Sequence, residues 1–109
     1  MDYIERIEAL GACAPALDWL RSEQHPTLQA AWDACPQGDW LLWVLAAMGH
    51  PAYSDAQDAV LCSPEAQRAY EIVWSYDISD PEYRGALANL NTIKARVVRT
   101  VVPVAPVLP

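Results

Sequence analysis

The chain has 109 residues, which is enough for one domain and too few for two. Hydrophobic residues make up 53% of the sequence, so we expect a packed globule and not a disordered chain. Fourteen acidic residues against seven basic ones give a net charge of −7, which argues against direct nucleic-acid binding and favours a basic partner. The apolar runs are shorter than the about 20 residues that a helix needs to span a bilayer. The N-terminus also lacks the basic start of a signal peptide. These two observations predict a cytoplasmic protein without membrane contact.

Start and stop signals divide most of the chain into short helices. Apolar residues recur at helical spacing over 3–10, and Gly11 follows as a stop. Thr27 is a good N-cap, and Pro64 is suited to the first turn of a helix. These patterns predict helices over 2–10, 14–24, 28–35, 54–62 and 65–76. The sequence therefore predicts an all-α protein.

The most apolar segment runs from Trp40 to Met48, between Asp39 as the expected N-cap and Gly49 as a stop. A buried strand is the competing interpretation, but the length of the run and its flanking signals favour a helix. Because this helix is apolar on every side, we expect the other helices to surround it. The predicted fold is a compact bundle of about six short helices around this central apolar helix, 40–48.

A long helix that begins near Asp80 and an apolar tail complete the chain. The last basic residues lie in the final turns of this helix, where the helix dipole favours cations. Proline stands at every third position near the end of the tail, which prevents a helix and favours an extended polyproline conformation. We predict one helical domain over 1–100 and an extended tail over 101–109. The tail either packs back across the helices or docks on another chain.

Signals for catalysis and metal binding are weak. Phosphate-binding loops, zinc-protease pairs and nucleophile elbows all lack their characteristic spacing. Cys13, Cys35 and Cys62 form no C-x-x-C pair, and each lies beside apolar helical positions, so we expect buried, reduced thiols. His25 and His50 both precede proline, which is typical of turns. We therefore predict no catalytic residues, no cofactor and no metal site, and hence a protein that is not an enzyme.

An acidic segment suggests a surface for a protein partner. Between residues 55 and 82, seven acidic residues stand against Arg68 alone, an excess that presents a negative field to a partner. Ordinary solvated helix faces are the alternative explanation. The acidic candidates for partner binding are Asp55, Asp58, Glu65, Glu71 and Asp77.

The five tryptophans are the most unusual feature of the composition. Tryptophan is a common core residue, and when it is exposed it often marks a binding hot spot. We expect Trp40 and Trp43 in the core, and we predict Trp19 or Trp74 as the surface anchor for a partner.

The N-terminal half also carries a pattern of small residues, tryptophans and cysteines. It consists of Gly11-Ala12-Cys13, Ala16-Leu17-Asp18-Trp19, Ala31-Trp32-Asp33-Ala34-Cys35 and Gly38-Asp39-Trp40-Leu41-Leu42-Trp43. Over about residues 8–45, the chain resembles small phage and prophage proteins identified as immunity proteins. The resemblance implies an all-helical, non-enzymatic protein that acts by binding, and it assigns no catalytic residues.

These observations lead to two hypotheses of function. The leading hypothesis is a phage or mobile-element protein, similar to an anti-CRISPR or immunity protein. It inhibits a host defence or toxin protein by covering a basic, nucleic-acid-binding surface. The alternative is a structural or assembly protein that oligomerises through its apolar C-terminal tail. The oligomeric state and the identity of the target are left open by the sequence.

Overall fold

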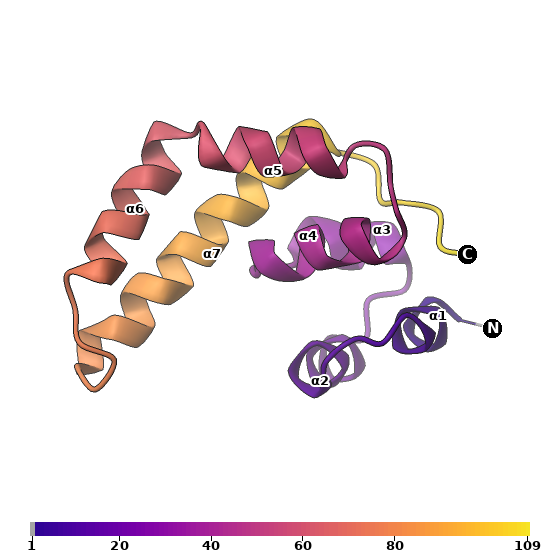
Figure 1. Cartoon of the computed structure of the whole chain (residues 1–109). Coiled ribbons are helices and arrows are strands. Elements are labelled where there is room, and N and C mark those ends of the chain that lie inside the picture. The colour runs from indigo at the N-terminus through magenta and orange to yellow at the C-terminus, as the bar shows by residue number, and fades with distance from the viewer. Residues whose placement is uncertain (1) are drawn as a thin grey trace.

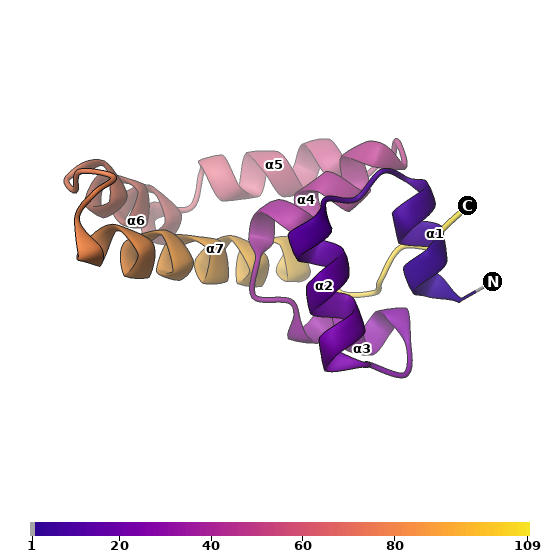
Figure 2. The same cartoon turned by 90° about the horizontal axis from the view of Figure 1, so that it is seen from below.

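The computed structural model describes residues 2–109, and this part of the chain holds seven α-helices and no strand. In chain order they are α1 (Tyr3–Ala9), α2 (Ala14–Glu23), α3 (Leu28–Ala34), α4 (Gly38–Ala47), α5 (Tyr53–Leu61), α6 (Pro64–Trp74) and α7 (Pro81–Val101). The all-α class is confirmed, with seven helices where about six were expected. The molecule measures 44 × 28 × 20 Å, and Figures 1 and 2 show α6 at one end and α1 at the other.

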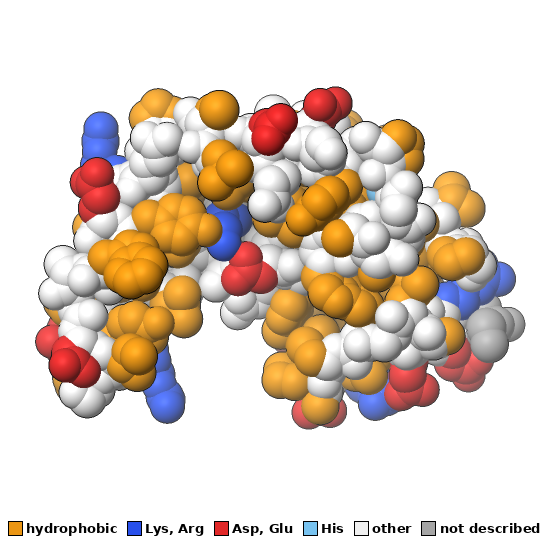
Figure 3. All heavy atoms as spheres, viewed as in Figure 1, with side chains coloured by type: hydrophobic (Ala, Val, Ile, Leu, Met, Phe, Trp, Pro, Cys, Tyr) orange, Lys and Arg blue, Asp and Glu red, His pale blue; other side chains and the backbone are white. Residues whose placement is uncertain are grey.

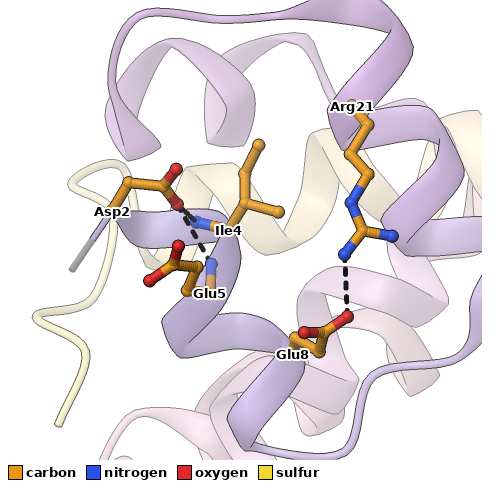
Figure 4. Close-up of polar contacts among 5 residues, drawn as sticks. All are labelled: Asp2, Ile4, Glu5, Glu8 and Arg21. Carbon is orange, nitrogen blue, oxygen red and sulfur yellow. Dashed lines mark hydrogen bonds and ion pairs between the residues drawn. The ribbon is translucent and has the colours of Figure 1, made fainter.

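Short polar side chains define where several helices begin. The Asp2 carboxylate accepts hydrogen bonds from the backbone N–H groups of Ile4 (2.7 Å) and Glu5 (3.0 Å), as Figure 4 shows. Thr27 caps α3 in the same way, and Ser63 and Asp80 cap α6 and α7. Each cap satisfies N–H groups that have no partner inside the helix, and this fixes where the helix starts.

The larger hydrophobic core is built around α7, the longest helix (Figure 1). Helices α4, α5 and α6 all pack against α7, and Leu45 and Val98 are fully buried between them. The start of α4 crosses α7 so closely that a Cβ on Gly38 would lie 2.7 Å from the carbonyl carbon of Lys94, and closer still to its Cβ. A glycine is therefore required at the crossing of α4 and α7.

A smaller core lies between α1, α2 and the adjacent faces of α3 and α4. It consists of Ile7, Leu17, Leu20, Ala31, Val44 and Leu108. Arg21 of α2 pairs with Glu8 of α1 at 2.7 Å (Figure 4), but both side chains are about half exposed. An exposed pair of this kind adds little stability, so burial of the apolar side chains holds this layer in place.

The C-terminal tail packs against its own chain. The indole Nε1 of Trp32 donates to the Val102 carbonyl (2.8 Å), and the Gln29 side chain bonds to the Pro103 carbonyl (3.0 Å) and the Ala105 N–H (2.7 Å). Leu108 is buried in the smaller core. The tail therefore connects α3 and the end of α7 to the α1–α2 layer.

Helix α4 differs from the expected central helix in two respects. Its N-cap is Gln37 and not Asp39, which lies in the first turn and pairs with Lys94 of α7 at 2.6 Å. The helix also has an exposed side, with Trp43 37% exposed and Ala47 exposed near its end. The expectation that other helices enclose α4 on every side, with Trp43 in the core, was therefore wrong. The reason is that α1 and α2 cover only part of α4.

Two of the three cysteines are not buried. Cys35 is buried, and burial raises the pKa of its thiol, although a backbone hydrogen bond with Gln37 and the Arg99 charge act in the opposite direction. Cys13 and Cys62 are exposed because they lie at helix ends, as the N-cap of α2 and the C-cap of α5. All three thiols are free.

Candidate functional site

Helix α6, residues 75–80 and the first turns of α7 form a projecting hairpin that we call the arm. Val73 is buried inside the arm, and Tyr70, Tyr83 and Leu87 pack against the hydrophobic core to which Val73 belongs. Figure 1 shows α6 and α7 side by side, and in Figure 3 an open gap separates the end of the arm from the rest of the molecule. The end of the arm is thus accessible from several sides.

Large hydrophobic side chains are exposed at this end, which we call the arm tip and define as Ile72, Trp74 and Ile78. Trp74 is 82% exposed, Ile78 is 80% exposed and Ile72 is 46% exposed. Figure 3 shows hydrophobic side chains gathered over α6. Burial of these side chains would be favourable by about 1.5–3 kcal/mol for each one fully covered. A cluster of this kind is a typical contact site for another protein.

The loop that carries Ile78 is held in a defined turn. The Asp77 carboxylate accepts hydrogen bonds from the backbone N–H and the hydroxyl of Ser79, each at 3.0 Å. These bonds hold the pKa of Asp77 below its ordinary value, so the carboxylate stays charged in mild acid. Because the turn is fixed, Ile78 is presented outward at little further cost in conformational entropy.

Acidic side chains border the arm tip and continue along α5. Asp55, Asp58, Glu71 and Asp77 are all exposed, and none of them forms an ion pair within residues 2–109. Figure 3 shows acidic side chains at the outer edges of α5 and α6. We call these four residues the acidic edge. Glu65 differs from them, because its carboxylate pairs with Arg96 of α7.

The two tryptophans predicted as anchors lie in different parts of the molecule. Trp74 is exposed, as predicted, and lies at the arm tip. Trp19 is half-buried in α2, where its ring lies 5.6 Å from that of His25 and 6.1 Å from that of Trp40. Trp19 therefore does not belong to the same surface as the acidic residues.

Sequence reasoning missed Ile72 and Ile78. Ile72 follows Glu71 on the outer side of α6, next to but not among the buried positions Ala69 and Val73. Ile78 stands between Asp77 and Ser79 in a polar turn, where it has no helical neighbours to pack against. An isolated isoleucine in a polar turn was the signal that could have identified it.

Comparison of the chain with protein-family models, with curated proteins and with solved structures gives no match. Within the described part of the chain, no three His, Cys, Asp or Glu side chains gather closely enough to hold a metal ion. None of the helices described is both long and apolar enough to cross a membrane. The arm combines an apolar tip with unpaired negative charges, an arrangement suited to binding a protein surface.

Proposed function

We propose that this chain is a non-enzymatic binding protein that attaches through its arm to a basic surface of another protein. The observation that carries the proposal is the exposure of Trp74 and Ile78 beside carboxylates that have no partner in residues 2–109. Trp is over-represented among interface residues that contribute about 2 kcal/mol or more to binding. The arm tip would supply affinity, and the acidic edge would speed association and select a positively charged partner.

The more specific proposal is that the partner is a host defence or toxin protein and that its basic surface normally binds nucleic acid. The chain would then act as a phage or mobile-element inhibitor, of the anti-CRISPR or immunity-protein kind, in the cytoplasm of the host. Two observations support this proposal: the net charge of −7, and the resemblance of residues 8–45 to phage and prophage immunity proteins. A negative surface competes for the same lysines and arginines that neutralise phosphates.

Capture from the host cytoplasm, with the full-length chain as bait, tests the proposal. In one variant, Trp74→Ala with Ile78→Ala removes the apolar tip. In a second, Asp55→Asn, Asp58→Asn and Glu71→Gln neutralise three charges of the acidic edge. A matched control neutralises Glu5, Asp18 and Glu23, which are exposed on α1 and α2 and give the same change in net charge.

We expect the wild type and the control to retain a basic protein that neither the variant of the arm tip nor the variant of the acidic edge retains. For the purified pair, the affinity should fall at least about tenfold between low and physiological salt for the wild type, and less for the variant of the acidic edge. A partner that all four proteins retain equally, with no salt dependence, would contradict binding through the arm.

Assembly through the tail is the second candidate function, and the observed packing of the tail weighs against it. Exchange between copies would have to break the contacts of Trp32 and Gln29 with the tail and remove Leu108 from the smaller core. Deletion of 101–109 followed by measurement of the mass in solution separates the two functions. An oligomer that becomes a monomer on deletion would favour assembly over inhibition.

A further inference from the structure

A pocket of about 310 Å³ is lined by residues of α1, α2, α3 and α4 and of the turn between α1 and α2. Figure 1 shows α1 and α2 at the end of the molecule opposite to α6 and the arm tip. Its lining includes Cys13, Ala16, Trp19, Ala31 and Trp40. Ligand sites in proteins start at about 300 Å³, so the pocket is large enough for a small molecule.

The pocket exists because small side chains line part of it, and because the large side chains in its lining are held in place by contacts with other residues. Ala16 of α2 and Ala31 of α3 are both buried and leave space where larger side chains would fill it. The ring of Trp19 packs against that of Trp40, at 6.1 Å between centroids, and this contact holds it at the wall of the pocket. Trp32, also in the lining, is fixed by its hydrogen bond to Val102. The cavity is therefore preformed and does not depend on a ligand to open it.

The polar groups in the lining do not favour a charged ligand. The Asp39 carboxylate is already paired with the Lys94 ammonium at 2.6 Å. Burial raises the pKa of the Cys35 thiol and keeps it neutral. Among residues 2–109, the one buried side-chain atom without a hydrogen-bond partner is Nε2 of His25, which is not part of the lining. A charged molecule would lose its hydration in the pocket without compensation.

We propose that this pocket binds an uncharged small molecule with two or three aromatic rings. A cavity of about 150 Å³ lined by apolar residues is known to hold benzene, so a pocket of twice that volume suits a larger flat molecule. Trp19 and Trp40 in the lining supply aromatic rings, with which such a molecule would make stacked or edge-to-face contacts. This site is independent of the proposed protein partner, since no residue of the arm lines it.

The cysteines provide a direct test with an internal control. Cys13 is exposed and lines the pocket, whereas Cys62 is exposed at the end of α5 and does not. The probe is N-phenylnaphthylamine, an uncharged fluorescent molecule. At a free concentration about ten times its Kd, bound probe should slow alkylation of Cys13 by iodoacetamide about tenfold and leave the rate at Cys62 unchanged. Mass spectrometry of the two peptides measures both rates in one sample.

A pair of substitutions on one helix localises the binding. Ala16→Met places a longer side chain in the pocket, and Ala14→Met makes the same change at an exposed position outside the lining. We expect the first variant to lose probe fluorescence and the second to retain it. If Ala16→Met fails to fold, the protection of Cys13 in the wild-type protein still decides the question.

Three outcomes would overturn the proposal. The first is that the probe gives no protection of Cys13 at any concentration. The second is equal protection of Cys13 and Cys62, which would mean general adsorption. The third is protection of Cys13 in the absence of probe, if this protection increases with protein concentration and is lost in the Trp74→Ala variant. That result would show that the exposed indole of a second copy fills the pocket.

Discussion

The two hydrophobic cores of this chain differ in which segments of the sequence complete them. The larger core surrounds α7 and contains the fully buried Leu45 and Val98. The smaller core joins α1 and α2 to the rest and includes Leu108, which comes from the other end of the chain. Helices α1 and α2 therefore depend on a contact between the first and last segments of the sequence. We infer that the α1–α2 layer is the less stable part of the molecule.

The two ends of the molecule also place their tryptophans differently. In the arm, Trp74 points outward and is almost fully exposed. At the other end, Trp19 of α2 and Trp40 of α4 pack on each other and line a pocket. In the two proposals, the same residue type would serve an outward surface for a protein at one end and an inward site for a small molecule at the other.

The first prediction compares the two cores by truncating one leucine in each. Leu45→Ala should lower the free energy of unfolding by about 2–5 kcal/mol, because it leaves a cavity at the centre of the larger core. Leu108→Ala should cost less, about 1.5–3 kcal/mol. Urea unfolding measures both values. Hydrogen exchange should show faster opening of α1 and α2 in Leu108→Ala and little change in α6 and α7.

Val107→Ala is the control for this comparison, because Val107 is 89% exposed and its truncation should have almost no effect. If Leu108→Ala instead destabilised α6 and α7 as much as α1 and α2, the two cores would form one cooperative unit. The proposed difference in stability would then be wrong.

The second prediction concerns the crossing of α4 and α7, which connects the two cores. Gly38→Ala should cost about 1–3 kcal/mol, because the added methyl would overlap the backbone of Lys94 and Ala95. Gly85→Ala is the matched change within α7, where a Cβ meets nothing within 4 Å. It should raise stability by about 0.5–1 kcal/mol through better helix propensity. Equal effects of the two substitutions would show that α4 and α7 do not pack closely enough at Gly38 to exclude a methyl group.

Much of the fold could be predicted from local signals in the sequence. Thr27 and the Ser63-Pro64 pair mark helix starts in the structure as they do in the sequence. The N-cap of α4 was misplaced because Asp39 is by residue type a better cap than Gln37, which makes no side-chain cap bond, and because the partner of Asp39, Lys94, lies 55 residues away. Local patterns do not reveal contacts of this range. The role of Gly38 was missed for the same reason.

The candidate sites were only partly predictable. The exposure of Trp74 was predicted, but Ile72 and Ile78 were not identified, because exposure depends on which faces find neighbours. From the sequence, the pattern over residues 11–43 indicated a family resemblance but did not indicate where these residues lie in the fold. In the structure most of its small, Trp and Cys residues line the one pocket described above. Residues scattered over four segments meet there only because α1 and α2 fold back on α3 and α4.

The third prediction is a pH dependence at the ion pair beside Gly38, and it is the smallest effect. Burial alone would lower the pKa of Lys94, but its polar contacts and charge interactions with Asp39 and Tyr70 outweigh burial, and the pKa lies above the ordinary 10.5. The charged ammonium is thus favoured in the folded state. Its contribution to stability is fully present below the unfolded-state pKa of about 10.4 and is lost as the pH rises through the higher folded-state value.

Lys94→Met tests this sign. The stability difference between the wild type and Lys94→Met should be constant from neutral pH to about pH 9.5 and should shift against the wild type as the pH rises above about 10.4. Because Tyr70 also contributes to the raised pKa of Lys94, the measurement is repeated with Tyr70→Phe in both proteins. This change removes the hydroxyl and keeps the ring, whose centroid lies 5.1 Å from the ammonium. A difference that moved in favour of the wild type at high pH would mean that burial outweighs the pair. The crossing of α4 and α7 would then be held by close packing at Gly38, and not by charge.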